Sequence, residues 1–194
     1  MPDVFPLRKI GIYGGTFDPI HHGHLILARE ALEAIGLDKV IFVPAAISPF
    51  KDPPVASAAV RLSMLRAAID GETAFAVDEC ELERPSPSYT IDTVENIRKR
   101  HPDSQIYCLI GEDTVPSLPK WHRFAELEKL VRFVVLDRTG SQAKHSYEVV
   151  RRNIDISATQ IRNRVASGRP IRYLLPPPVE EIIRRHNLYR ESVK

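Results

Sequence analysis

The sequence has few of the features that mark secreted, membrane-spanning or metal-binding chains. Of its 194 residues only Cys80 and Cys108 are cysteines, and they have neither a metal-ligand spacing nor a nearby cysteine partner, so we expect reduced thiols. No apolar run approaches the roughly 20 residues that cross a bilayer, and residues 1–6 do not resemble a secretory signal. We therefore expect a cytoplasmic protein with no membrane partner.

The sequence also lacks a large excess of either positive or negative charge. The formal net charge of +2 is too small to indicate nucleic acid as the main partner, so any positive potential must be local. A content of 43% hydrophobic and 27% charged residues is typical of a globular chain.

The length predicts a single domain over residues 1–194, with residues 153–194 as a C-terminal helical part. Whether the protein forms a homo-oligomer stays open.

Apolar segments alternate between two kinds along the chain. Short β-type runs are followed by longer segments with helical spacing and by connections of ordinary length. The predicted strands are 10–13, 40–43, 74–77, 105–110, 132–136 and 153–156, and the predicted helices are 25–35, 56–69, 91–100, 124–131, 157–168 and 176–186. This alternation predicts an α/β fold, a Rossmann-like doubly wound parallel sheet with a small helical C-terminal region. Its site should lie where the strand order reverses, between strands one and four.

Residues 11–24, between the first strand and the first helix, carry the strongest local pattern. A strand, a glycine turn and a helix start present free backbone N–H groups and a positive helix end, which suits phosphate. Gly14 and Gly15 let a ligand approach the main chain. His21 and His24 are three residues apart, so on a helix they share a face and could contact one oxyanion. The alternative is a turn before an ordinary surface helix.

A second helix start follows residue 156. Ser157 is a predicted N-cap, and Arg162 adds a permanent charge with planar donors. Together they could bind another phosphate, although a capped surface helix with scattered arginines would have the same pattern.

Several other polar and aromatic residues have two interpretations each. Asp113, just past a central strand, suits ribose hydroxyls or a positive partner. Trp121 could be a core anchor or a ligand platform, and Lys51, in the proline-rich loop 44–54, could simply be solvated. Ser88 or Thr90 can cap the helix over 91–100. The acidic run over 79–83 is expected to face solvent.

Two segments together resemble a known family. Residues 14–24, Gly-Gly-Thr-Phe-Asp-Pro-Ile-His-His-Gly-His, resemble the G-x-F-D-P-x-H-x-G-H motif of the nucleotidyltransferase superfamily, which shares its HxGH element with class I aminoacyl-tRNA synthetases. Residues 156–162 resemble the I-S-x-T-x-I-R element of the same group. Within it the chain resembles, over nearly its whole length, the bacterial nicotinate-nucleotide adenylyltransferases.

The resemblance implies roles for individual residues. The implied catalytic, phosphate-holding residues are His21, His24, Lys51 and Arg162. The implied ATP contacts are Gly14, Gly15, Thr16, Phe17, His21, His24, Ser157, Thr159 and Arg162. The implied mononucleotide contacts are Tyr89, Thr90, Asp113, Trp121 and His122, with Trp121 stacking on the pyridine ring. The family often has Pro-His-Lys where this chain has Pro49-Phe50-Lys51, so the histidine of that loop is absent.

The implied reaction is transfer of AMP from ATP to nicotinate mononucleotide, which releases pyrophosphate. Mg²⁺ is expected to arrive with ATP, bound by phosphates and water, with no metal site on the protein. Three alternatives stay open: nicotinamide mononucleotide as substrate, phosphopantetheine as substrate, or a non-catalytic nucleotide-binding module. The Trp121–His122 pair argues against phosphopantetheine, and the intact His21, His24 and Arg162 argue against a non-catalytic module.

Overall fold

The computed structural model describes residues 7–46, 53–85, 87–140 and 145–190, and in these residues the chain forms one six-stranded sheet. The strand order is β3-β2-β1-β4-β5-β6, and every neighbouring pair is parallel. The order reverses between β1 and β4, as predicted, and this is where open α/β sheets bind ligands. The strands are β1 (Lys9–Gly15), β2 (Lys39–Pro44), β3 (Phe75–Val77), β4 (Gln105–Gly111), β5 (Arg132–Asp137) and β6 (Glu148–Arg151).

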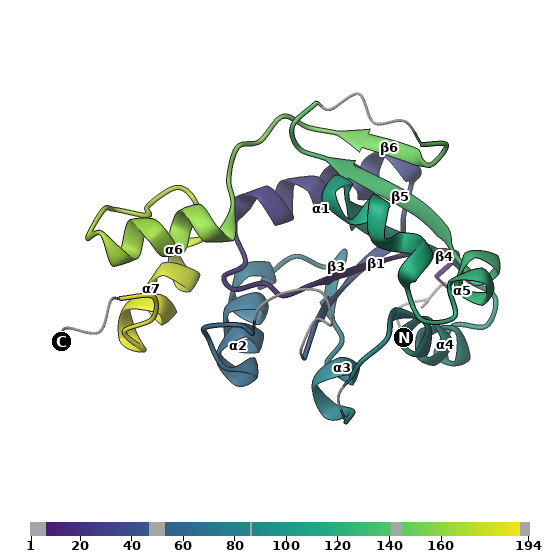
Figure 1. The fold of residues 1–194 in the computed structure, drawn as a ribbon, viewed down its shortest axis with the longest axis horizontal. Helices are drawn as coiled ribbons and strands as arrows, with labels where there is room; N and C mark the ends of the chain where they lie inside the picture. The colour runs from purple at the N-terminus through teal and green to yellow at the C-terminus, as the bar shows by residue number, and fades with distance from the viewer. Residues whose placement is uncertain (1–6, 47–52, 86, 141–144, 191–194) are drawn as a thin grey trace.

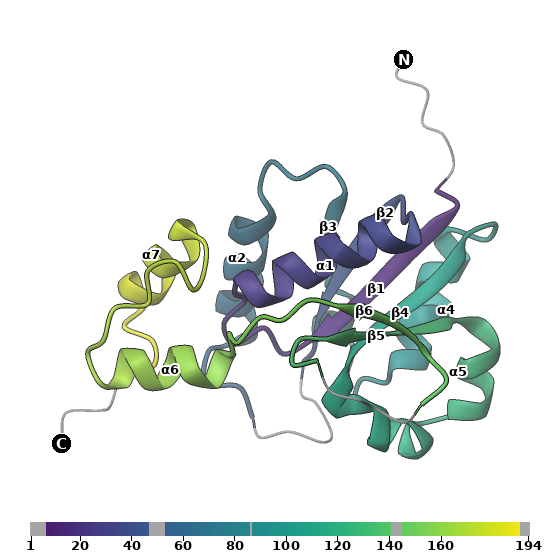
Figure 2. The ribbon, with the colours of Figure 1, turned by 90° about the horizontal axis from the view of Figure 1, so that it is seen from above.

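Helices cover the sheet and extend past one end of it. In Figures 1 and 2, α6 and α7 lie together at the end of the molecule away from α4 and α5. No helix in the described ranges is long and apolar enough to cross a membrane. The helices are α1 (His22–Ile35), α2 (Ala58–Ile69), α3 (Cys80–Glu83), α4 (Thr90–Arg100), the 3₁₀ segment η1 (Glu112–Lys120), α5 (Phe124–Leu130), α6 (Ala158–Ala166) and α7 (Pro177–Arg185).

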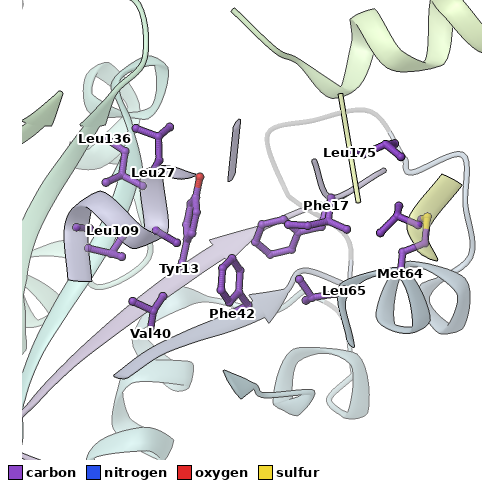
Figure 3. Packing of buried hydrophobic residues seen from close by; sticks show 14 of the residues in the cluster. Tyr13, Phe17, Leu27, Val40, Phe42, Met64, Leu65, Leu109, Leu136 and Leu175 are labelled. Atoms are coloured by element: carbon purple, nitrogen blue, oxygen red, sulfur yellow. The ribbon is translucent and has the colours of Figure 1, made fainter. Parts of the chain in front are cut away.

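The core has two halves because successive side chains of a strand point to opposite faces of the sheet. Tyr13 on β1 and Leu109 on β4 pack with Leu27 of α1 and with α2 on one face (Figure 3). Ile12 on β1 packs on the other face with Ile97 of α4 and with α5. Burial of both faces explains why the strands are almost continuously apolar.

Local signals define several helix ends. Gly36 ends α1 with a left-handed backbone (φ 67°), a conformation that glycine adopts without steric cost. Ser157 caps α6 as predicted, and its hydroxyl accepts a hydrogen bond from the Gln160 backbone N–H at 3.1 Å. These caps satisfy backbone groups that a helix end leaves unpaired.

Three expectations about local structure were wrong. Glu81, in the acidic run, is buried and accepts a hydrogen bond from the Thr93 hydroxyl at 2.8 Å. Ser88 does not cap α4, because its hydroxyl donates to the Glu81 carbonyl, and Tyr89 occupies the N-cap position with no side-chain cap bond. The last strand is β6, so residues 153–156 are not a strand. For Glu81 and Ser88, contacts between the segments before and within α4 override the local signal.

Candidate active site

A cavity of about 1230 Å³ opens at the carboxyl ends of the central strands, at the reversal of strand order. Its walls come from the turn after β1, the start of α1, the segments after β4 and β5, and the start of α6. Both sequence motifs therefore border the same space. The predicted site residues in its lining are Gly14, Gly15, Thr16, Phe17, His21, His24, Asp113, Ser157, Thr159 and Arg162.

The two motif histidines lie face to face at the start of α1. The rings of His21 and His24 stack with their centroids 3.7 Å apart and 24° between their planes. Burial, followed by the positive charge of Arg138, lowers the pKa of His21 to about 3. A neutral imidazole still offers one donor and one acceptor. The buried Nδ1 of His21 has no hydrogen-bond partner among the described residues.

Two glycines allow the close approaches that shape the cavity. A Cβ on Gly23 would lie 3.0 Å from the His21 ring and 3.3 Å from the Ile156 carbonyl oxygen. A Cβ on Gly15 would lie 2.8 Å from the Phe17 ring, which is turned back against it. Gly23 therefore lets the first motif lie directly against the residue that precedes α6.

Arg162 connects the two motifs. Its Nη1 donates to the Asp18 carbonyl at 2.8 Å, and its Nη2 donates to the Thr159 hydroxyl at 3.2 Å. A guanidinium carries five N–H donors in a plane, so these bonds leave donors for an anion. The imidazoles and this guanidinium therefore share one cavity, as the phosphate-binding hypothesis requires.

Sequence reasoning missed Arg138. It directly follows β5, is exposed, lines the cavity, and donates to the Ile156 carbonyl at 3.4 Å. Burial raises the pKa of Tyr13 in the same wall, and the charge of Arg138 opposes that rise. The sequence signal that could have identified Arg138 is its position directly after a predicted parallel strand, because ligands bind at the carboxyl ends of such strands.

The remaining predicted mononucleotide contacts, including Thr90, are not part of the cavity lining. Tyr89 stacks on His122 with centroids 4.2 Å apart and 28° between the planes. Trp121 is half-buried and packs against the half of the core that contains Ile12 and Ile97. Its ring meets the Phe133 ring edge-on, with the centroids 6.4 Å apart. Trp121 is thus at least partly a core anchor, and its role in binding stays a prediction. Lys51 lies outside the described residues.

The part of the chain that the structure describes contains no group of three or more His, Cys, Asp or Glu side chains arranged to hold a metal ion. We can therefore name no protein ligand set for Mg²⁺, and its arrival with ATP stays a prediction.

The chain matches known proteins over most of its length. Residues 12–164 match the cytidylyltransferase-like family. Over 187 residues the chain is 41% identical to a Bacillus pumilus protein named "probable nicotinate-nucleotide adenylyltransferase", an alignment that covers 94% of this chain and 99% of that one. This chain belongs to the nicotinate-nucleotide adenylyltransferase family. A relative with the same name in Exiguobacterium sibiricum is 44% identical over 186 residues, which cover 93% of this chain and 98% of the relative.

Solved structures confirm the fold of this adenylyltransferase family member. The nicotinic acid mononucleotide adenylyltransferase of Plasmodium falciparum, solved in complex with NaAD, superposes with a TM-score of 0.80 at 19% identity. The superposition covers 96% of this chain and all of the other. The predicted family and the predicted Rossmann-like fold are both confirmed.

Proposed function

We propose that this chain transfers AMP from ATP to nicotinate mononucleotide, giving deamido-NAD and pyrophosphate. One observation carries the proposal: Arg162 of the second motif donates to the Asp18 carbonyl of the first, at the wall of the cavity that His21 and His24 also line. Two helix starts and several cationic or donor side chains thus surround a space suited to a triphosphate.

The proposed step is an in-line displacement. An oxygen of the mononucleotide 5′-phosphate forms a bond to the α-phosphorus of ATP while the bond from that phosphorus to the bridging α–β oxygen breaks. Pyrophosphate leaves with that electron pair. The attacking phosphate is already an anion, so no protein nucleophile or general base is needed. Catalysis then consists of positioning and charge stabilisation.

The geometry supports a division of roles on the ATP side. Backbone N–H groups of Gly15, Thr16 and Phe17 would orient the α-phosphate. His21 and His24 would donate to the phosphate oxygens, and Arg162, with Lys51, would stabilise the charge that grows on pyrophosphate. Arg138, which also lines the cavity, would supply a further cation. Ser157 and Thr159 would contact the phosphates at the start of α6. Mg²⁺ would enter with ATP as part of the substrate.

On the mononucleotide side, Asp113 lies in the cavity wall and would accept hydrogen bonds from ribose hydroxyls. Trp121 would stack on the pyridine ring, with Tyr89, Thr90 and His122 beside it. A carboxylate on that ring separates nicotinate from nicotinamide by charge, so a comparison of the two mononucleotides tests the specificity directly.

The decisive experiment measures pyrophosphate release from ATP with each acceptor in turn. We expect kcat/KM for nicotinate mononucleotide to exceed the values for nicotinamide mononucleotide and phosphopantetheine. A higher kcat/KM for either of the other two acceptors would change the assigned substrate and leave the proposed adenylyl transfer in place. ATP binding without pyrophosphate release from any acceptor would favour the non-catalytic alternative.

A further inference from the structure

A buried carboxylate connects the C-terminal end of the described chain to the cavity. The Asp18 side chain is 4% exposed, and its Oδ2 accepts the Val55 backbone N–H at 2.7 Å. Its Oδ1 accepts the Ala56 backbone N–H at 3.2 Å and the Tyr189 hydroxyl at 2.6 Å. The carbonyl of the same residue accepts the Arg162 guanidinium. One residue thus bonds to Tyr189 through its side chain and to Arg162 through its main chain.

Tyr189 is held firmly for a residue so close to the end of the chain. It follows α7, lies 171 positions from Asp18, and is 7% exposed. Its φ of 60° is uncommon for a bulky residue, so its surroundings must maintain this backbone conformation. Burial, reinforced by the bond to the Asp18 carboxylate, raises the pKa of the Tyr189 phenol. The phenol therefore stays protonated and acts as the donor.

We propose that Tyr189 is a positioning residue for ATP binding: through the Asp18 carboxylate it fixes the peptide whose carbonyl orients the Arg162 guanidinium into the cavity. This inference rests on the proposed function, because it assumes that Arg162 holds the ATP phosphates. Tyr189 does not line the cavity, so its effect on a ligand would have to pass through Asp18.

Two cations lie near the bonded Asp18–Tyr189 pair, because the charges of Arg162 and Arg61 oppose the rise in the pKa of Tyr189. Arg61 is only 1% exposed, and its Nη1 donates to the Thr16 carbonyl at 2.7 Å. Both cations make their own bonds to carbonyls of the turn after β1. Loss of the tyrosine hydroxyl would leave Asp18 Oδ1 short of one donor while both cations stay nearby. The carboxylate could then rotate toward them, and the Asp18 peptide would lose its fixed orientation.

The test is Tyr189→Phe, which removes the hydroxyl and keeps the ring. We expect the calorimetric Kd for ATP to rise about five- to tenfold, equivalent to about 1–1.4 kcal/mol, a usual size for coupling within one hydrogen-bond network. The KM for nicotinate mononucleotide should change much less. Tyr173→Phe is the matched control, since Tyr173 is 78% exposed and lies in the same C-terminal part. A folded Tyr189→Phe protein that binds ATP as tightly as the parent would overturn the proposal.

Two further variants keep the test decisive. Asp18→Asn alters the acceptor of the same Tyr189–Asp18 hydrogen bond and should also weaken ATP binding. It replaces Tyr189→Phe as the test if that variant does not fold. In Tyr189→Phe combined with Arg162→Lys, the loss should be smaller than the sum of the single losses, whereas additive losses would show that Tyr189 does not act through Arg162. Because ATP binding is measured without turnover, a failed pyrophosphate assay would refute the proposed function and leave this test intact.

Discussion

The two ends of the proposed substrate site are built differently. At the proposed phosphate end, His21 and His24 lie at the start of α1 and Arg162 lies within α6, and Arg162 joins the two segments by donating to the Asp18 carbonyl beside an open cavity. At the pyridine end, Tyr89 and His122 stack on each other in connecting segments, outside the cavity lining. The Arg162 guanidinium has N–H donors beyond those that bond to Asp18 and Thr159. At the other end, Tyr89 and His122 already contact each other, and aromatic pairs of this kind contribute about 0.5–1.5 kcal/mol.

The largest effect should come from the phosphate end. In the proposed mechanism His24→Ala removes a donor aimed at charge that develops during transfer, and loss of one such donor typically costs about 10²–10³ in kcat. We expect that loss with little change in mononucleotide binding, measured by steady-state pyrophosphate release and by calorimetry. His22→Ala is the matched control, because His22 lies on the same helix turn but not in the cavity lining. Equal losses in turnover and in mononucleotide binding would contradict the assigned role.

A second prediction concerns the pH dependence of stability. The pKa of His21 is about 3 in the folded protein, against an ordinary value of 6.5. Between these values the unfolded chain binds a proton that the folded chain does not, so the stability contributed by neutral His21 falls as the pH drops below about 6.5. From pH 7 to pH 5 we expect a loss of about 2 kcal/mol in the free energy of unfolding.

Urea unfolding of the parent and of His21→Asn isolates this contribution, because asparagine does not titrate. The parent should lose about 2 kcal/mol more than the variant over the same pH interval. Parallel pH profiles would show that His21 is protonated readily in the folded protein, and it would then not be the neutral, buried imidazole that its lowered pKa indicates.

The smallest effect is expected at the pyridine end. Trp121→Ala should raise the KM for nicotinate mononucleotide about tenfold, as expected for loss of an aromatic stacking platform. The KM for ATP should stay nearly constant. Trp121→Phe keeps an aromatic ring for stacking and for the contact with Phe133. Comparison of the two variants therefore distinguishes a role in binding from a role in packing. If both variants lower the melting temperature and leave both KM values unchanged, Trp121 is a core anchor only.

The fold was largely predictable because its signals are local and repeated. Apolar strands alternate with helical segments, and the reversal between β1 and β4 is typical of the doubly wound sheet that this alternation predicts. The phosphate end was predictable too, because glycines, histidines and a capping serine are short-range patterns. The cavity lining includes Gly14, His24 and Arg162, as those patterns indicated, although their contacts with ligands stay predictions.

Residues whose roles depend on distant partners were not predictable in this way. Glu81 is buried because Thr93 and Ser88 meet it across a loop, whereas its acidic neighbours suggested an exposed face. Arg138 carries no motif and reaches the cavity only because β5 delivers it there. Tyr189 has a partner 171 positions away, and no local pattern encodes a contact of that range.

The sequence alone determined the family, the doubly wound sheet and the two motifs, since each rests on patterns within short segments of the chain. Tertiary structure decided how those motifs meet: Gly23 lies against Ile156, Arg162 bonds to Asp18, and Tyr189 closes the same network. The physical reason is that a hydrogen bond depends on distance and direction in space, and for residues far apart in the chain only the packed fold sets both.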